Sequence, residues 1–239
     1  MSLLSTNTAW GVCKFWGKDE YIGRSLYNYG EWSGAECEMI RSLSRGGVFL
    51  DIGANIGFMS MALKSVASEI VAFEPQPEVY SVMIENIKNA VGDARFNIIN
   101  CGVSNKAGTA QMPRIRYGDK GNYGGLGFGR SELGSYPVNI ITIDGMELPS
   151  VDLVKIDVEG HELQVLEGMV DTISRCRPVM YIEDDRPEKS KALREFIIRN
   201  GYTIEEHNPP MYREDNFKGL MKNIWDRNYV SKNIICRPC

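Results

Sequence analysis

Acidic side chains follow three short apolar runs in this chain of 239 residues. Asp51 ends the run VFLD, Glu74 follows IVAF, and Asp157 ends DLVKID. Each run has the length and composition of a buried strand, and ligands of open parallel sheets bind at the carboxyl ends of the strands. The three carboxylates are therefore expected to face a ligand that offers positive charge or hydroxyl groups.

The first of these carboxylates begins a glycine-containing turn, DIGANIG, between a predicted strand and a predicted helix. Gly53 is expected to let the backbone turn tightly, and Gly57 to let the helix pack closely on the sheet. A dinucleotide pyrophosphate needs bare backbone at the middle position, where this chain has Asn55. Asp51 would repel a phosphate but attract an ammonium or a sulfonium. The turn therefore favours S-adenosylmethionine over NAD, with a mere turn cap at Asp51 as the alternative.

Glu74 ends the second predicted strand, about twenty residues after the glycine turn, where a carboxylate can accept both ribose hydroxyls. NAD and S-adenosylmethionine both use such a carboxylate. Glu74 thus predicts a nucleoside without choosing between them. A solvated carboxylate before Pro75 is the alternative interpretation.

The stretch DLVKIDVEGHE forms a second dense cluster of polar residues. Lys155, Asp157 and Glu159 would share one face if the strand continued that far, because side chains alternate along a strand. A plain salt bridge between Lys155 and Asp157 is the competing interpretation. His161 titrates near neutrality and is a candidate general base, although a histidine at the start of a surface helix is an equal explanation.

The stretch YIEDDR ends the next predicted strand with three carboxylates, among them Glu183, and an arginine. This strand end lies where a substrate should bind. A metal site would need ligands from several elements, and a bridge from Arg186 to Asp184 or Asp185 explains the charges as well. We expect no metal.

The elements that must position these residues alternate between short apolar strands and amphipathic helices, the pattern of βαβ units in a doubly wound α/β sheet of about seven strands. Residues 112–136 interrupt the alternation with seven glycines and no periodicity, as a long loop or an irregular hairpin. The predicted strands are 48–51, 70–73, 96–101, 138–143, 152–157, 178–182, 202–205 and 233–236. The predicted helices are 34–44, 58–66, 77–87, 162–173 and 189–200.

The bulk properties narrow the choice of function. A net charge of −4 argues against a general binder of nucleic acid or of anionic membranes. No apolar stretch approaches the ~20 residues that span a bilayer, and residues 1–10 do not read as a signal peptide. Six scattered cysteines, including a terminal CRPC, read as free thiols, so a reducing, cytoplasmic location is expected.

Five blocks in order resemble the FkbM-type S-adenosylmethionine-dependent methyltransferases. They are LDIGANIGFMSMAL, VAFEPQPEVYSVMIENIKNA, VDLVKIDVEGHELQVLEGM, RPVMYIEDDR and the tail HNPPMYREDNFKGL…NIICRP. The resemblance implies the class I methyltransferase fold, a Rossmann-like seven-stranded sheet with a reversed last strand. It implies a single domain over 1–239, in which an N-terminal extension (1–45) covers the cofactor and 46–239 form the core.

The resemblance also implies roles for residues. Gln76 and the segment with Gly102 and Val103 would lie near the adenosine, and Glu74 would bind the ribose. The methionine end of the cofactor would be lined by Asp51, Gly53, Asn55 and Gly57. The acidic positions near the reactive methyl group would be Asp157, Glu159 and Glu183, and His161 stands where relatives carry other residues. The loop GDKGNYGGLGF and the segment YGEW would lie near the catalytic cleft and over the cofactor.

Members of this family are associated with O-methylation of hydroxyls on sugars, glycans and polyketides, so a small-molecule or glycan acceptor is expected. The residues leave Asp157, Glu159, Glu183 and His161 open as the group that receives the acceptor proton. Two other hypotheses remain, an NAD-dependent oxidoreductase and a catalytically silent nucleoside-binding module. The acceptor and the oligomeric state are left open.

Overall fold

The fold is built on a seven-stranded sheet, seen in a computed structural model that describes residues 3–225 and 229–239. The strand order is β11-β12-β10-β9-β3-β4-β5, and β12 runs antiparallel to both of its neighbours while the other strands are parallel. This confirms the predicted sheet with a reversed last strand. The strands are β3 (Val48–Ile52), β4 (Glu69–Phe73), β5 (Arg95–Ile99), β9 (Leu153–Ile156), β10 (Val179–Glu183), β11 (Tyr202–His207) and β12 (Asn233–Pro238).

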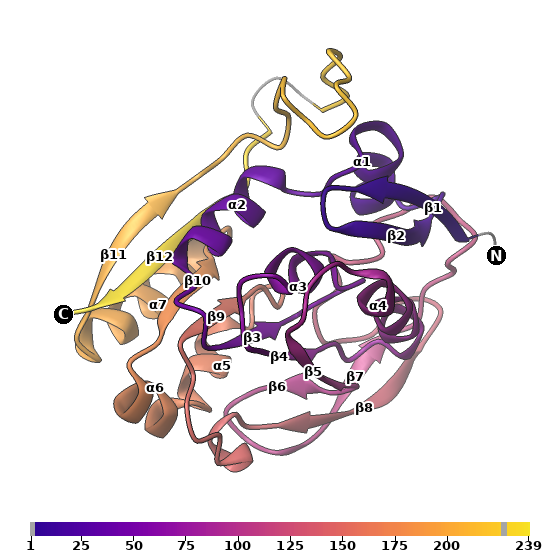
Figure 1. Ribbon diagram of the computed structural model, residues 1–239. Helices are drawn as coiled ribbons and strands as arrows, with labels where there is room; N and C mark the ends of the chain where they lie inside the picture. Colours follow the sequence, from indigo (N-terminus) through magenta and orange to yellow (C-terminus); the bar gives the residue numbers. More distant parts are fainter. Residues whose placement is uncertain (1–2, 226–228) are drawn as a thin grey trace.

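Helices cover both faces of this sheet, as Figure 1 shows. One face carries α2 (Gly34–Leu43), α3 (Phe58–Leu63) and α4 (Pro77–Asn89). The other carries α5 (Glu162–Glu167), α6 (Val170–Cys176) and α7 (Pro187–Arg199). The predicted helix 162–173 is wrong in one respect, because α5 and α6 are separate. A methyl group at Gly168, between them, would lie 2.0 Å from the Ser104 carbonyl oxygen, so the chain bends where it meets that backbone.

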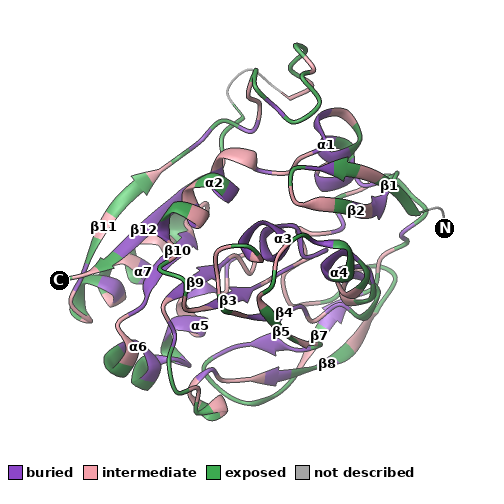
Figure 2. Ribbon diagram, in the orientation of Figure 1, coloured by how far each residue is buried: buried purple, intermediate pink, exposed green. Residues whose placement is uncertain are grey.

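Burial on both faces explains the apolar strands. Along β3, Phe49 packs into the cluster with α2, α3 and α4, and its neighbour Leu50 packs into the cluster with α5, α6 and α7. Figure 2 shows the central strands as buried over most of their length. A strand covered on both sides cannot alternate between apolar and polar residues, so it reads as a continuous hydrophobic run.

The chain reverses its winding direction at β3, which lies between β4 on one side and β9 on the other. The connections leaving β3 and β9 therefore diverge and open a crevice at the carboxyl ends of these two strands. Asp51 pairs in register with Lys155, which in turn pairs with Tyr181 on β10. The sheet register thus sets three polar side chains in a row beneath the crevice.

Smaller elements lie outside this core. A three-stranded sheet joins β6 (Gly102–Val103), β8 (Ser135–Ile141) and β7 (Gly108–Pro113). The predicted strand 138–143 belongs to this small sheet and not to the central one, because it pairs only with β6 and β7 among the described strands. Residues 114–134 connect β7 to β8, which agrees with the predicted irregular hairpin.

The amino-terminal segment forms a hairpin and a helix that the sequence patterns did not reveal. The hairpin consists of β1 (Leu3–Thr8) and β2 (Gly11–Trp16), and α1 (Ile22–Tyr29) follows it. The hairpin docks on α4, where the Lys14 amide donates to Asn86 Oδ1 over 2.6 Å. Residues 1 and 2 of the predicted extension lie outside the described residues.

Two further predictions concern bulk properties. All six cysteines carry free thiols, as their scattered positions predicted. Within residues 3–225 and 229–239, the structure contains no helix with the length and apolar character that a bilayer-spanning segment needs.

Candidate functional site

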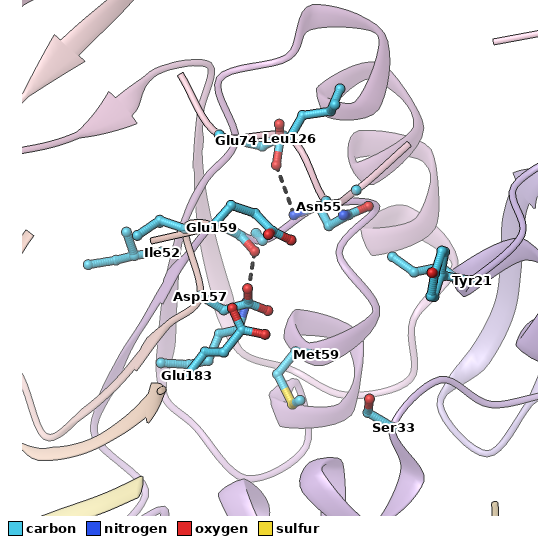
Figure 3. A pocket seen from close by; sticks show the side chains of 18 of the residues that line it. Tyr21, Ser33, Ile52, Asn55, Met59, Glu74, Leu126, Asp157, Glu159 and Glu183 are labelled. Atoms are coloured by element: carbon cyan, nitrogen blue, oxygen red, sulfur yellow. Dashed lines mark hydrogen bonds and ion pairs between the residues drawn. The ribbon is translucent and has the colours of Figure 1, made fainter. Parts of the chain in front are cut away.

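A cavity of about 480 Å³ opens at the carboxyl ends of β3, β4, β9 and β10. This volume lies within the ~300–1,000 Å³ that is usual for small-molecule sites. The cavity lies at the reversal of strand order, where the sequence predicted ligand binding. Among the predicted site residues, those that line it are Gly53, Asn55, Glu74, Gln76, Gly102, Val103, Asp157, Glu159 and Glu183. Figure 3 shows several of these side chains around it.

The glycine turn has left-handed backbone at its three critical positions. Gly53, Asn55 and Gly57 have φ angles of 79°, 53° and 81°. Asparagine is among the few non-glycine residues that adopt this conformation readily, which explains how Asn55 occupies the middle position. A methyl group at Gly53 would lie 1.9 Å from the Asp157 carbonyl oxygen, so the turn requires glycine there. A methyl group at Gly57 would lie 2.8 Å from Met83 Cγ on α4. The close approach at Gly57 is therefore to α4, whereas the prediction was close packing of the helix on the sheet.

Glu74 is held by the backbone on both sides of its carboxylate. Its Oε2 accepts from the Asn55 amide over 3.0 Å, and its Oε1 accepts from the Gln76 amide over 2.9 Å. The side chain is buried, and burial raises its pKa to about 7. Glu74 is therefore oriented into the cavity (Figure 3) and is not the solvated carboxylate of the alternative interpretation.

Asp51 lies beneath the cavity and does not line it. Its side chain is fully buried, its Oδ2 accepts from Ser60 Oγ over 2.6 Å, and its Oδ1 lies 3.6 Å from Lys155 Nζ. Lys155 also donates to the Gly53 carbonyl over 2.8 Å, so it ties β9 to the glycine turn. Asp51 thus orients Lys155, and Lys155 is the group of the two that reaches the cavity.

Three carboxylates gather beside this lysine. One oxygen each from Asp157, Glu159 and Glu183 lie within 4.8 Å of one another, a spacing at which they could share a cation. β9 ends at Ile156, before Asp157 and Glu159, so the condition that the strand continue as far as Glu159 is not met. A turn with positive φ at Glu159 brings it beside Asp157 instead. Asp157 and Glu159 therefore lie close together, but a turn places them there and not a continued strand.

Positive partners surround part of the carboxylate cluster. Lys155 Nζ lies 3.3 Å from Asp157 Oδ2, and Arg186 lies 2.6 Å from Glu159 and 2.9 Å from Asp185. The salt bridges that competed with functional interpretations are thus present. Glu183 Oε2 is buried and has no hydrogen-bond partner among the described residues.

Burial and like charge disfavour ionisation of two of these carboxyls. Burial, together with the Asp157 charge, raises the pKa of Glu159 to about 7. Burial and the Asp157 and Asp185 charges raise the pKa of Glu183 well above its ordinary value. A carboxylate with a raised pKa is the better proton acceptor near neutral pH.

His161 lies outside the cavity lining. Its Nε2 is 2.9 Å from Ser104 Oγ, and its ring meets Phe128 edge-on with centroids 5.3 Å apart. Burial lowers its pKa, with a further contribution from Lys189. The histidine therefore supports the loop that carries Phe128 and is separated from the other three candidate bases.

The glycine-rich loop covers the glycine turn. Gly124 lies so close that a methyl group there would be 2.1 Å from Asn55 Nδ2. Gln76 fixes the loop, because it donates to the Tyr123 carbonyl over 3.2 Å and accepts from the Tyr117 hydroxyl over 3.0 Å. Asn122 and residues 124–128 of this loop line the cavity.

The two ends of the chain also supply lining residues, among them Trp32 of the segment YGEW. Tyr21, Trp32 and Glu36 come from the amino-terminal segment, and Tyr229 comes from the segment before β12. Burial raises the pKa of Glu36 to about 7. Residues 10–32 are rich in aromatic side chains, a feature of the sequence that fits a core or dimer role as well as an acceptor site.

The sheet order, the reversed strand and the strand-end cavity define a class I methyltransferase fold, and solved structures agree. The chain is similar to methyltransferase FkbM from Methylobacillus flagellatus, with a TM-score of 0.53, 15% identity, and coverage of 91% of this chain and 55% of that one. It is also similar to precorrin-6y C5,15-methyltransferase from Geobacter metallireducens, with a TM-score of 0.51, 14% identity, and coverage of 85% and 87%. At these identities the likeness establishes the fold alone.

Sequence comparison establishes the family. The methyltransferase FkbM domain matches residues 51–230, and the chain belongs to this family. A hexuronic acid methyltransferase of Haloferax volcanii is 32% identical over 141 residues, which cover 53% of this chain and 51% of that protein. The methyltransferase sdnD of Sordaria araneosa is 30% identical over 168 residues, covering 56% and 64%. The chain thus spans between about half and two thirds of these relatives, and the family implies a methyl donor of the S-adenosylmethionine type.

Proposed function

We propose that this protein transfers a methyl group from S-adenosylmethionine to a hydroxyl of a sugar, a glycan or a polyketide-like small molecule. The observation that carries the proposal is the gathering of Asp157, Glu159 and Glu183 within 4.8 Å in the same cavity as Glu74. Negative groups at the reversal of the sheet suit a cationic, phosphate-free cofactor.

The residues present fit that cofactor. Glu74 offers a fixed carboxylate to two ribose hydroxyls, and Gly102 and Val103 would bound the adenosine with Gln76. The glycine turn, with Asn55 in place of bare backbone, would lie at the methionine end beside Asp157. Asp51 would act through Lys155. The bound cofactor supplies the electrophilic methyl group of its sulfonium.

Asp157 and Glu183 are proposed to receive the acceptor proton. Both line the cavity, and the unpartnered Oε2 of Glu183 is free to accept a hydroxyl among the described residues. Glu159 is bound by Arg186, so we give it the supporting role of orienting the cluster. Much of the rate would come from alignment of acceptor and methyl group, which is worth up to ~7–11 kcal/mol. His161 is assigned no proton transfer, because it contacts Ser104 outside the cavity.

Family membership and the glycine turn guide the choice among the three hypotheses: methyl transfer, NAD-dependent oxidation and a catalytically silent binding module. Membership in the FkbM family and Asn55 at the middle position favour methyl transfer over NAD-dependent oxidation. A silent binding module would have no need of an unpartnered Glu183 at the strand end. We keep a sugar hydroxyl first among acceptors because one relative is a hexuronic acid methyltransferase. Six free thiols are typical of a reducing compartment, so a cytoplasmic location remains our prediction.

The direct test is transfer of isotope-labelled methyl groups from S-adenosylmethionine by the purified protein into extracts of its native host. We expect the label in a product that carries it as the methyl group of a methyl ether. No label is expected when Asp157→Asn and Glu183→Gln are combined. Incorporation by the double variant equal to that of the unmodified protein would refute the proposed chemistry. NAD-dependent oxidation of an extract component without methyl transfer would favour the second hypothesis.

A further inference from the structure

The part of the cavity away from Glu74 is built from both ends of the chain. Tyr21 and Trp32 line it from the amino-terminal segment, and Tyr229 lines it from the segment between β11 and β12. Figure 3 shows Tyr21 across the cavity from Asp157 and Glu183. An acceptor bound between Tyr21 and these two carboxylates, to which we assign its proton, would contact both sides.

The three rings share one aromatic support, Trp225. Its ring stacks on Tyr21 with centroids 6.1 Å apart, lies 5.4 Å from Tyr229, and meets Trp32 edge-on at 6.3 Å. Arg24 lies over Trp225 at 5.3 Å and donates to the carbonyl of Ile224 over 2.6 Å. We call Tyr21, Trp32, Trp225 and Tyr229 the aromatic wall.

The wall is held in place by hydrogen bonds between segments far apart in the sequence. The Tyr29 hydroxyl accepts from the Ile224 amide over 2.7 Å and lies 3.1 Å from the Lys222 carbonyl, to which it donates. Lys218 donates to the Tyr27 carbonyl over 2.7 Å, and the Phe217 amide donates to Glu31 over 2.9 Å. Rings fixed in this way bind with little loss of conformational entropy.

The groups across from the wall are polar. Ser33 and Glu36 follow Trp32 along the chain, Ser231 follows Tyr229, Asp157 comes directly after β9, and Glu183 ends β10; all five line the same cavity as the wall. A flat polyketide ring would be enclosed better by apolar groups on both sides. A pyranose has one apolar C–H face, which packs on aromatic rings, and hydroxyls at its edge, which donate to carboxylates. The lining matches that two-sided chemistry.

We propose that the aromatic wall is the acceptor subsite and that it binds a pyranose ring by stacking, with a ring hydroxyl directed to Asp157 and Glu183. This inference rests on the proposed methyl transfer and narrows its acceptor to a carbohydrate. Tyr21 and Tyr229 are specificity-determining residues, because both line the cavity and neither is buried.

The test is saturation-transfer NMR on the full chain in the presence of S-adenosylhomocysteine. The probes are the methyl pyranosides of glucose, galactose, mannose, rhamnose and glucuronic acid, with an aromatic phenol ester as the polyketide-like probe. We expect at least one pyranoside to bind through its ring C–H protons. Tyr21→Ala and Tyr229→Ala should each weaken that binding about tenfold, and Tyr21→Phe should retain it.

Ile198→Ala is the control, because Ile198 lies on α7 with its side chain exposed and outside the cavity. Affinity for S-adenosylhomocysteine, measured separately by calorimetry, should be unchanged in all four variants and shows that each is folded. Intact cofactor binding with no bound pyranoside, or pyranoside binding that both alanine variants retain, would overturn the subsite alone. Loss of cofactor binding by the unmodified protein would instead overturn the proposed function.

Discussion

The two sides of the cavity are held in different ways. The strand-end floor (Asn55, Glu74, Asp157, Glu159 and Glu183) is fixed by the central sheet, through backbone amides at Glu74 and ion pairs at Asp157 and Glu159. The four residues of the aromatic wall lie outside the strands of the central sheet, and the wall depends on contacts between the two chain ends. Under the proposed function, the central sheet holds the cofactor side of the cavity, and contacts between the two chain ends hold the acceptor side.

The largest expected effect lies in the floor. Combining Asp157→Asn and Glu183→Gln should lower kcat by ~100–10,000-fold, the usual contribution of general acid–base groups. The amides are close in size to the carboxylates, so circular dichroism and S-adenosylhomocysteine binding should stay near those of the unmodified protein. A kcat within threefold of the unmodified value would remove proton transfer from the floor.

Two buried carboxyls of the cavity, Glu36 on α2 and Glu74 in the floor, predict that stability falls with rising pH. The pKa of Glu36 and that of Glu74 are each raised to about 7 by burial, so the folded state binds protons that the unfolded state releases. Their stabilising contribution is complete below about pH 4.5 and is lost as pH rises through about 7, on the order of 3 kcal/mol for each carboxyl.

Denaturant unfolding between pH 5 and 8 measures this slope. Glu36→Gln and Glu74→Gln should each flatten it. Cofactor affinity should show the opposite sign and increase through about pH 7, because ionised carboxylates attract the sulfonium and accept ribose hydroxyls. Stability of the ligand-free protein that increases from pH 5 to 8 would contradict the electrostatic account of the floor.

Substitutions at the two ends of β4 distinguish an effect on cofactor binding from a general effect on the sheet. Glu74→Ala removes a charged acceptor for the ribose and both amide contacts, and it should weaken S-adenosylmethionine binding by ~10–100-fold. Glu69→Ala is the matched control, since Glu69 begins the same strand and pairs only with the exposed Arg95 among the described residues. Equal affinities of the two variants in calorimetry would show that the ribose assignment is wrong.

The glycine-rich loop lines the same cavity, and substitutions in it should lower cofactor affinity less than Glu74→Ala does. Gly124→Ala places a methyl group 2.1 Å from Asn55 Nδ2, so either the Asn55 side chain or the loop must shift, and cofactor affinity should fall by roughly 3–10-fold. Gly118→Ala, in the same loop with nothing within 4 Å, should leave affinity unchanged. If the two substitutions behaved alike, the loop would not be part of the cofactor site.

The smallest expected effect concerns metals. Lys155 and Arg186 already provide positive partners for Asp157 and Glu159, so methyl transfer is expected to proceed without a cation. Incubation with EDTA should change kcat by less than about twofold. Loss of activity that Mg²⁺ restores would instead make the carboxylate cluster a metal site.

The sequence predicted the floor because its signals are local and periodic. Buried parallel strands read as apolar runs, and the residue after each run must lie at the same edge of the sheet, which located Glu74, Asp157 and Glu183. The position of Asp51 beneath the cavity could not be predicted from these signals. Asp51 faces α3 and accepts from Ser60, nine residues later in the chain, and this contact depends on helix packing.

The aromatic wall could not be predicted in the same way. Tyr21 and Trp225 meet across some two hundred residues, and their pairing depends on the packing of segments without periodicity. The same limit applies to Glu36, whose helix α2 was predicted but whose orientation toward the cavity was not. His161 illustrates the converse, a residue type suited to catalysis that tertiary structure directs to Ser104.

The central claim is that the strand-end floor binds a cationic, phosphate-free nucleoside cofactor. Parallel calorimetric titrations of the unmodified protein with S-adenosylmethionine and with NAD test it most directly. The account predicts one-to-one binding of S-adenosylmethionine, weakened by Glu74→Ala and not by Glu69→Ala, and no measurable heat from NAD. Binding of NAD with no response to S-adenosylmethionine would contradict it.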